Sequence, residues 1–221
     1  MGGIEDNYGY SVALSMDGLI LAVGANKHSS AAPEAGQVQT YKYNSVAKLW
    51  EQIGQDLIGE KEGDEFGVSV ALSAIGHVLA VGAYWHNLRK DEPNAGQVRV
   101  YVYDSGDNTW AQLGQSLDGE EANDQFGWSV ALPSDGTIVA AGADEHDGNG
   151  RSSGTIRAFR YSNDTGLWTK LGASLDGESE GDDFGISVAL SADGFTLAGG
   201  SNRNDAKGND AGHVRVFQFR P

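Results

Sequence analysis

Three histidines stand at the same place in successive stretches of the chain and could do metal chemistry. Each lies three residues beyond the alanine of a Gly-Ala pair, and a fourth equivalent position holds Asn204. They are His28, His86 and His146. Imidazoles gathered around one axis could bind a transition metal, and each could equally bond its own loop. The sequence leaves both interpretations open.

Acidic side chains gather in four short segments, each directly before an aromatic-Gly pair. The chain has 31 Asp and Glu against 15 Lys and Arg, a formal net charge of −16. The clustering predicts a ligand-binding face that would take a cation or a basic partner. The alternative is solubility together with an Asp that caps the turn in each segment. The residues predicted for this face are Asp64, Glu65, Asp124, Asp182 and Asp183, together with Trp85 and the three histidines.

One loop offers a candidate calcium site, although it does not follow the spacing of a known calcium loop. The stretch 144–150 reads DEHDGNG, and Asp144, Asp147 and Asn149 supply oxygen atoms of the kind that calcium prefers. It lacks the alternate-position ligands and the distal Glu of an EF-hand. Calcium is therefore the one cofactor that the sequence suggests, and the acidic face is its other expected position.

Two further tryptophans interrupt the regular pattern of the chain. Trp85 lies in a loop whose sequence differs between the successive repeated stretches of the chain. An exposed ring there could stack on a sugar or anchor a partner. Trp128 follows an aromatic-Gly pair, and we expect it to contribute to packing.

Composition and missing motifs exclude several classes of function. The chain has no Cys, which rules out disulfides, thiolate zinc sites and thiol catalysis. It has no Gly-x-Ser-x-Gly elbow, His-Glu-x-x-His motif or phosphate loop, so we expect it not to be an enzyme. The negative charge argues against nucleic acid as a partner. No apolar run approaches the roughly 20 residues needed to cross a membrane, so no membrane insertion is expected. The first ten residues do not resemble a signal peptide.

Four sets of markers in register divide the chain into four copies of one unit. The aromatic-Gly pairs begin at Tyr8, Phe66, Phe126 and Phe184, with steps of 58, 60 and 58 residues. Three other markers keep the same spacing. They are a Gly that ends an apolar run, a Gly that opens a β-branched run, and the series Trp50, Trp110 and Trp168. Such periodicity indicates a repeat architecture. We expect one domain over 1–221, with repeats at about 3–62, 63–122, 123–180 and 181–221.

Each unit reads as antiparallel strands. The second copy shows the two residue patterns typical of strands, alternation of apolar with polar or small residues and short continuous apolar runs. The segments are 66–73, 77–83, 96–104 and 110–117. Asp-Gly pairs favour tight hairpins between the first two strands. The pattern predicts an all-β fold, a β-propeller of four similar four-stranded blades whose last blade lacks its outer strand. The aromatic residues of the Phe-Gly and Trp series are expected to be buried between blades.

These ordered motifs resemble the FG-GAP repeats of the integrin α-subunit propeller. The similarity lies in the Phe-Gly pair, the Gly-Ala that closes the second strand, the later Gly-x-Val/Ile and the outer Trp-x-x-Leu/Ile-Gly. The resemblance implies a protein used for adhesion or ligand binding, located outside the cell or on its surface. The Asp-Gly turn here is too short for the family's calcium loop, because calcium takes six to eight oxygen ligands. The family usually has seven blades, so the four units form either a closed ring or part of a larger propeller, with further blades or a second copy as partners.

The leading hypothesis from the sequence is a non-enzymatic recognition or adhesion module that binds a protein or glycan through its long loops. Loops held by a rigid scaffold are where binding residues concentrate. A carbohydrate-binding lectin is the first alternative. A propeller-based hydrolase or lyase that uses loop carboxylates is the second.

Overall fold

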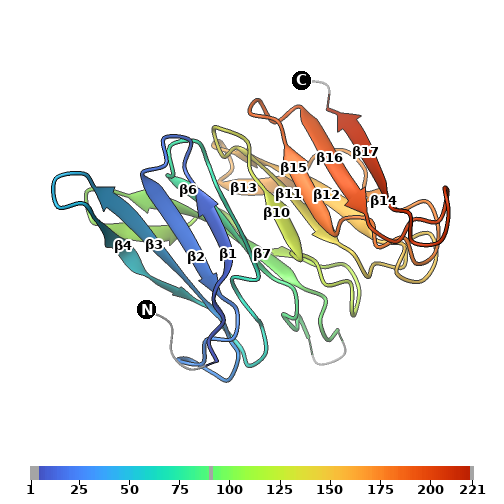
Figure 1. Ribbon diagram of the computed structural model, residues 1–221, viewed down its shortest axis with the longest axis horizontal. Coiled ribbons are helices and arrows are strands. Elements are labelled where there is room, and N and C mark those ends of the chain that lie inside the picture. Colours follow the sequence, from blue (N-terminus) through green and yellow to red (C-terminus); the bar gives the residue numbers. More distant parts are fainter. Residues whose placement is uncertain (1–4, 90–91, 220–221) are drawn as a thin grey trace.

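The computed structural model describes residues 5–89 and 92–219, and within these ranges the regular elements are all β-strands. Four antiparallel sheets stand side by side, in the order of the chain (Figure 1). The described part of the chain contains no helix that is long and apolar enough to cross a membrane. The all-β prediction is confirmed.

The first sheet is a simple meander. It consists of β1 (Tyr8–Leu14), β2 (Ile20–Ala25), β3 (Gln37–Asn44) and β4 (Leu49–Ile58), paired in that order. A register shift in the β3–β4 pairing falls near Gly54, which has a positive φ of 66°. Glycine adopts this backbone conformation at little steric cost.

The second and third sheets repeat this order but divide the outer strand. The second sheet contains β5 (Ser69–Leu72), β6 (Val78–Ala83), β7 (Gln97–Asp104), β8 (Thr109–Gln112) and β9 (Leu117–Asp118). The third sheet contains β10 (Ser129–Ala131), β11 (Ile138–Ala143), β12 (Thr155–Ser162), β13 (Leu167–Lys170) and β14 (Leu175–Asp176). The single outer strand predicted at 110–117 is therefore split. The break contains Gly114, whose φ of 74° interrupts the extended backbone.

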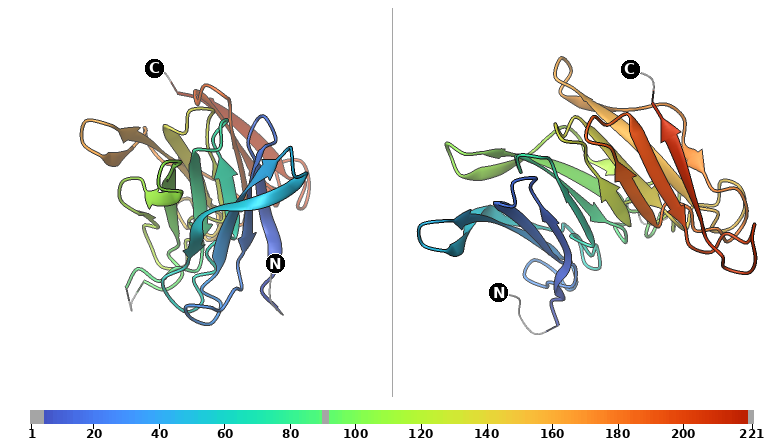
Figure 2. Two further views of the ribbon diagram at one scale, coloured as in Figure 1. Left: turned by 90° about the vertical axis from the view of Figure 1, so that its left-hand side faces the viewer. Right: turned by 45° about the horizontal axis from the view of Figure 1, so that its top comes forward.

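The fourth sheet has three strands among the described residues. They are β15 (Ser187–Leu190), β16 (Thr196–Ser201) and β17 (His213–Gln218). The first and fourth sheets lie at opposite ends of the array (Figure 1). The hairpins that lead to the outer strands project outward from it (Figure 2).

Neighbouring sheets pack face to face through three apolar cores. The first strands β1, β5, β10 and β15 lie beside one another, which sets the order of the sheets. At the boundary between the first and second sheets, Val38 and Leu57 meet Phe66, Leu79 and Trp110. Equivalent residues build the two later boundaries. Because each sheet is apolar on both faces, only a neighbouring sheet can remove those faces from water.

The aromatic-Gly segment of each later sheet is fastened to the sheet before it. Phe66, Phe126 and Phe184 are fully buried. At the last boundary, the Phe184 amide donates to the Ser153 carbonyl at 3.0 Å, and the Ser129 hydroxyl donates to the Gly185 carbonyl at 2.7 Å. The two earlier boundaries contain the same pair of hydrogen bonds. The predicted burial is confirmed for the three phenylalanines, whereas Tyr8, for which the same burial was predicted, is only partly buried.

An arginine covers each of these phenylalanine rings, and two of the three, Arg99 and Arg157, are buried. The Arg157 guanidinium carbon lies 4.0 Å from the centre of the Phe126 ring, and its nitrogens reach Glu120 and the Asp118 carbonyl of the preceding sheet. Arg99 and Arg215 repeat this arrangement over Phe66 and Phe184. A cation over an aromatic face is favourable, more so when water is excluded.

A second line of hydrogen bonds joins the short turns at the far ends of the first strands. The Met16 amide donates to the Ala74 carbonyl, the Ala74 amide to Ser134, and the Ser134 amide to Ala192, at 2.8–2.9 Å. Residues in four consecutive sheets are thereby linked in series.

The tryptophan series shows one exception to the predicted burial. Trp110 and Trp168 are 4% and 3% exposed, and the Trp110 indole donates to the Thr40 hydroxyl of the preceding sheet at 2.8 Å. Trp50 is 40% exposed, so its predicted burial is wrong. The reason is positional: the Trp of each sheet packs against the sheet before it, and Trp50 belongs to the first sheet described.

Candidate active site

The loops before β5, β10 and β15 each place an acidic side chain at the centre of a tight turn. The Asp64 carboxylate accepts hydrogen bonds from the amides of Glu60 and Lys61 at 2.9 and 2.8 Å. Asp124 and Asp182 accept the equivalent pairs. All three are buried. The structure thus gives them the turn-capping role that the sequence also allowed.

The three histidines of the repeat pair with these aspartates or their equivalent. The His86 Nδ1 lies 3.1 Å from Asp64, the His146 Nδ1 lies 2.9 Å from Asp124, and the His28 Nδ1 lies 3.0 Å from Asp6. Each pair joins the two long loops of one sheet. Asn204 makes the same connection in the fourth sheet, where its amide donates to Asp182 at 2.9 Å. The histidines thus lie in separate Asp–His pairs, each bracing its own sheet.

Asn204 suggests a direct test of the His146–Asp124 pair. The hydrogen bond to Asp124 raises the pKa of His146 above its usual value. The pair therefore stabilises the fold below the unfolded-state pKa, and this stabilisation is lost as the pH rises through the folded-state pKa. We expect His146→Asn to remain folded and to lose more unfolding free energy, relative to wild type, at about pH 6 than at about pH 9. Urea unfolding at the two pH values measures this difference. An equal loss at both would show that His146 is not charged in the pair.

The three residues of the predicted calcium site have separate partners. The Asp147 carboxylate accepts the Ser152 amide at 2.8 Å, and the Asn149 side-chain amide donates to the Gly177 carbonyl at 2.7 Å. Asp144 interacts with a different set of charges, across the next sheet boundary. Among residues 5–89 and 92–219, no group of three or more His, Asp or Glu side chains is placed to hold a metal ion. Calcium binding stays a prediction.

Two repeated positions bring polar side chains together at each sheet boundary. One position precedes the aromatic-Gly pair and holds Glu65, Gln125 or Asp183, all with φ between 50° and 58°. Non-glycine residues adopt this conformation rarely, and such strain is concentrated at functional sites. The other position follows the Gly-Ala or Gly-Ser pair that ends the second strand, and it includes Tyr84 and Asp144.

At the boundary between the first and second sheets, these positions form a satisfied polar group. Glu65 accepts hydrogen bonds from Asn26 at 2.5 Å and from the Tyr84 hydroxyl at 3.2 Å. Burial first, and then the Glu65 charge, raise the pKa of Tyr84 well above its usual range. Trp85 and Trp128 pack against Tyr84 in tilted and edge-to-face geometry, with ring centres 5.4 and 4.9 Å from it.

At the boundary between the third and fourth sheets, the same positions place two carboxyl groups in one buried region. Asp144 and Asp183 are 6% and 4% exposed, and the Oδ1 atom of each lacks a hydrogen-bond partner. Glu145 and Arg203 complete the group, which we call the carboxyl cluster. The Arg203 Nε lies 3.2 Å from the second oxygen of Asp183. Buried carboxyl groups that lack hydrogen bonds favour the protonated form.

The carboxyl cluster contains the most perturbed acid of the described chain. Burial, followed by the charges of Glu145 and Asp183, raises the pKa of Asp144 to about 7. Burial also raises the pKa of Asp183, while Arg203 opposes this rise. An acid that exchanges its proton near neutral pH, close to a charged partner, is a candidate for acid–base chemistry.

A small pocket of about 250 Å³ lies between the two long loops of the third sheet, before β10 and after β11. Glu145 belongs to both, since it lines the pocket and its charge acts on Asp144. Gln125 and Arg151 are among the other lining residues. The pocket therefore offers a polar space of monosaccharide size whose connection to the carboxyl cluster is Glu145, whereas Asp144, Asp183 and Arg203 do not line it.

The structure separates the residues predicted for the ligand face into different surroundings. Glu65 and Asp183 occupy the strained position at sheet boundaries, and Trp85 is 40% exposed beside Tyr84. Sequence reasoning missed Tyr84, Glu145 and Arg203 as members of a site. For Tyr84 the available signal was its position, because Tyr84 and Asp144 follow the Gly-Ala pair at the same distance in two copies.

Comparison with solved structures relates the fold to two lactonases. The periplasmic gluconolactonase of Pseudomonas aeruginosa aligns with 96% of this chain and 57% of its own, at 15% identity and a TM-score of 0.59. A protein of Bacteroides fragilis described as a 6-phosphogluconolactonase aligns with 80% of this chain and 40% of its own, at 14% identity and a TM-score of 0.51. The chain thus spans about half the length of these structures. They share its fold.

These neighbours correct the expectation of a non-enzymatic adhesion module. Both proteins are described as lactonases, which are hydrolytic enzymes, so the prediction that the chain is not an enzyme is contradicted. A search of curated protein sequences gives no match. Residues 117–159 match the FG-GAP repeat family. This stretch runs from the outer strand of the second sheet into β12, and it identifies an FG-GAP repeat in the chain, as the sequence motifs predicted.

Proposed function

We propose that the protein is a hydrolase that opens an uncharged sugar lactone at the carboxyl cluster, with Asp144 as the general base. The observation that carries this proposal is Asp144 itself, a buried carboxyl group with an unpartnered Oδ1 and a pKa of about 7. A general base is most effective when its pKa lies near the working pH.

The groups around Asp144 have complementary parts in lactone hydrolysis. The Asp144 carboxylate accepts a proton from water while the water oxygen attacks the lactone carbonyl carbon. The resulting oxyanion is stabilised by a positive group, and Arg203 is the cation beside Asp183. The ring C–O bond then breaks, and the leaving alkoxide takes the proton back from Asp144. The product is an open-chain hydroxy acid, and no proton is gained or lost by the enzyme over the cycle.

The charge around the site favours an uncharged substrate. Asp144, Glu145 and Asp183 are opposed by Arg203 within the cluster, and the whole chain has a formal charge of −16. A phosphorylated lactone would enter against this field, whereas a neutral lactone would not. After ring opening, the carboxylate product is repelled by the same charges, which assists its release.

The structural neighbours support this reaction class and a location outside the cytoplasm. Both are described as lactonases, and one of them as periplasmic. Because a fold hosts many functions, the proposal depends on the site and takes only its substrate class from these proteins.

The test is hydrolysis of glucono-δ-lactone, followed as acid release above the spontaneous rate. We expect Asp144→Asn to lower kcat/KM by about 10²–10⁴-fold, the usual contribution of a general base. Asp164→Asn is the matched control, since it removes the same charge from an exposed hairpin between β12 and β13. It should leave the rate unchanged. For the wild type, kcat/KM should rise with pH through about 7 as Asp144 loses its proton.

Three outcomes would contradict the proposal. They are a wild-type rate no faster than the spontaneous reaction, an Asp144→Asn variant as active as Asp164→Asn, or a preference for the phosphorylated lactone.

A further inference from the structure

The outer face of the fourth sheet exposes residues that are buried at the same positions elsewhere. Val214 is 64% exposed, whereas its equivalents Val38, Val98 and Ile156 are fully buried. Val216 is 63% exposed, whereas its equivalents in the three preceding sheets are at most 4% exposed. In those three sheets the next sheet covers this face. The fourth sheet therefore presents a complete docking face without its cover.

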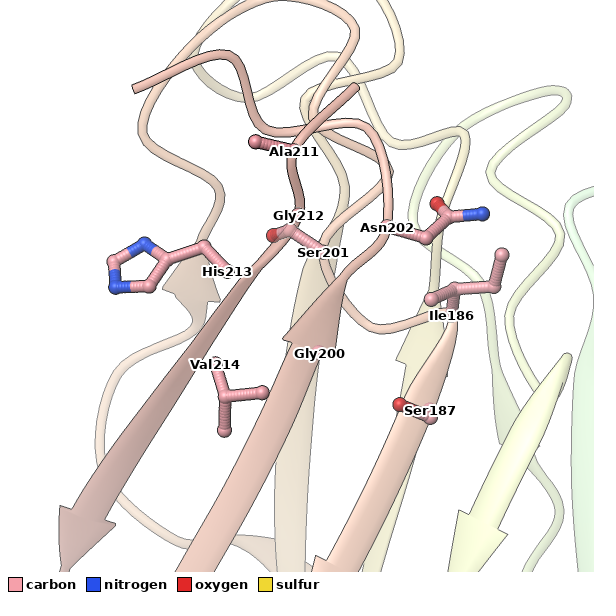
Figure 3. A pocket seen from close by; sticks show the side chains of 9 residues that line it. All are labelled: Ile186, Ser187, Gly200, Ser201, Asn202, Ala211, Gly212, His213 and Val214. Atoms are coloured by element: carbon pink, nitrogen blue, oxygen red, sulfur yellow. The ribbon is translucent and has the colours of Figure 1, made fainter. Parts of the chain in front are cut away.

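This face contains a pocket of about 430 Å³ at the end where an aromatic-Gly segment is held elsewhere (Figure 3). Ser187, Gly200 and Val214 line it from three adjacent strands. At the previous boundary their equivalents hold Phe184-Gly185. There, Ser129 donates to the Gly185 carbonyl, and that carbonyl lies so close to Gly142 that an added Cβ would come within 1.9 Å.

Gly200 shows that the pocket is vacant at this point. A Cβ added to Gly142, Gly82 or Gly24 would meet the carbonyl group of a glycine in the next sheet. A Cβ added to Gly200 would meet only atoms of Ser187, on its own sheet. The glycine that makes room for a neighbouring backbone is thus present, and its neighbour is not among the described residues.

The first sheet of the same chain exposes the matching surface. Tyr10, Val12 and Leu14 are 53%, 63% and 58% exposed, and they occupy the positions through which later sheets contact the sheet before them. Ahead of them lies the Tyr8-Gly9 pair. The φ of Gly9 is 93°, close to the values of 93°, 94° and 98° at the three glycines that are seated between sheets. The segment already has the backbone shape of a seated one.

We propose that a second copy of this chain docks its first sheet onto the fourth sheet of the first copy, head to tail. The Tyr8-Gly9 segment of the second copy enters the pocket at Gly200. There the Ser187 hydroxyl donates to its Gly9 carbonyl, and its Tyr8 amide donates to the Ala211 carbonyl, as at the three internal boundaries. The exposed valines of β17 then cover the apolar side chains of β1.

A second copy is the favoured occupant because one chain carries both complementary surfaces. Head-to-tail contacts of this kind close into a ring when the rotation permits and otherwise continue as a filament. Both faces are exposed among the described residues, and exposed apolar sheet faces favour association. The charge of −16 on each copy opposes association, so added salt should strengthen it.

Sedimentation velocity over about 1–100 µM protein, in about 0.15 and 0.5 M salt, tests the proposal. We expect concentration-dependent dimers or larger species, favoured by the higher salt. Val214→Lys and Val12→Lys each alter one exposed face, so each alone should raise the dissociation constant at least about tenfold. Val46→Lys is the control, because Val46 is 92% exposed on the β3–β4 turn. It should associate as the wild type does.

Mixing the two face variants distinguishes head-to-tail docking from other dimers. Val12→Lys retains an intact fourth sheet, and Val214→Lys retains an intact first sheet, so an equal mixture should form a one-to-one dimer through the single intact contact. The proposal is overturned if the wild type stays monomeric at about 100 µM in both salts. It is equally overturned if both variants associate like the wild type, or if the mixture forms no heterodimer while the wild type does.

Discussion

Replacing Phe126 by alanine will lower the free energy of unfolding by about 3–5 kcal/mol. The ring is fully buried between the second and third sheets. Its loss leaves a cavity and also removes the surface on which the Arg157 guanidinium stacks at 4.0 Å. Arg157 would then be a buried cation with fewer favourable contacts, although it would retain Glu120 and the Asp118 carbonyl.

Urea denaturation followed by tryptophan fluorescence measures this effect, since Trp110 and Trp168 are buried at the two boundaries of the second sheet. Tyr8→Ala is the matched control. Tyr8 occupies the same repeat position in the first sheet but is only partly buried, so its loss should cost clearly less. A loss below about 1 kcal/mol for Phe126→Ala, the typical effect of an arbitrary substitution, would contradict the assignment.

Replacing Asp144 by asparagine will stabilise the fold above neutral pH, by on the order of 3 kcal/mol. The pKa of Asp144 is raised to about 7 in the folded chain, whereas an unfolded aspartate titrates near its usual value. Between these two pKa values the folded state holds a proton that the unfolded state has released. Stability therefore falls as the pH rises through this window, and the full penalty is present above about pH 7.

Asparagine has nearly the same shape as the acid and carries no charge at any pH. The stabilisation by Asp144→Asn should therefore appear at about pH 8 and be much smaller at about pH 4, as measured by urea denaturation. Asp193→Asn provides the opposite case. Hydrogen bonds from Ser191 and the Phe195 amide lower the pKa of Asp193, so its replacement should destabilise the fold at neutral pH. Equal stability of wild type and Asp144→Asn at both pH values would contradict the raised pKa.

If both Asp144→Asn results are found, the same carboxyl group limits stability and supports activity. Active sites commonly retain groups that destabilise the folded state. The variant would then be an inactive protein that is harder to unfold, which separates loss of chemistry from loss of structure.

Much of the fold could be predicted from the sequence because the same contacts recur at each sheet boundary. The residues that make them therefore recur at a fixed spacing. The spacing of Phe66, Phe126 and Phe184 predicted their burial, since each meets the same environment in the preceding sheet. The same reasoning was wrong for Trp50, because burial at this position requires a preceding sheet and Trp50 lies in the first of the four described sheets. The outer strands were predicted as continuous, although Gly114 was an available signal for a break, since glycine inside a strand often marks a bulge.

The candidate site was harder to predict because its residues are distant in sequence. Asp144 and Asp183 belong to different sheets and are 39 positions apart, so only the packing of the third sheet against the fourth brings them together. In the sequence, Asp144 lies close to Asp147 and Asn149, which suggested a shared calcium loop. In the structure, its environment is set by burial at the sheet boundary, which leaves its Oδ1 atom without a hydrogen-bond partner.

The hydrogen bonds that connect Met16, Ala74, Ser134 and Ala192 have a consequence for how such a chain can change its length. The same three contacts recur between neighbouring sheets. They are a hydrogen bond between turns, a bound aromatic-Gly segment, and an arginine that donates to a carbonyl of the preceding sheet. The junctions are therefore alike in their backbone contacts, although their polar residues at the position of Glu65, Gln125 and Asp183 differ. An in-frame duplication or deletion of one unit would join backbone surfaces that already fit, and only the polar residues at the new boundary would have to be matched.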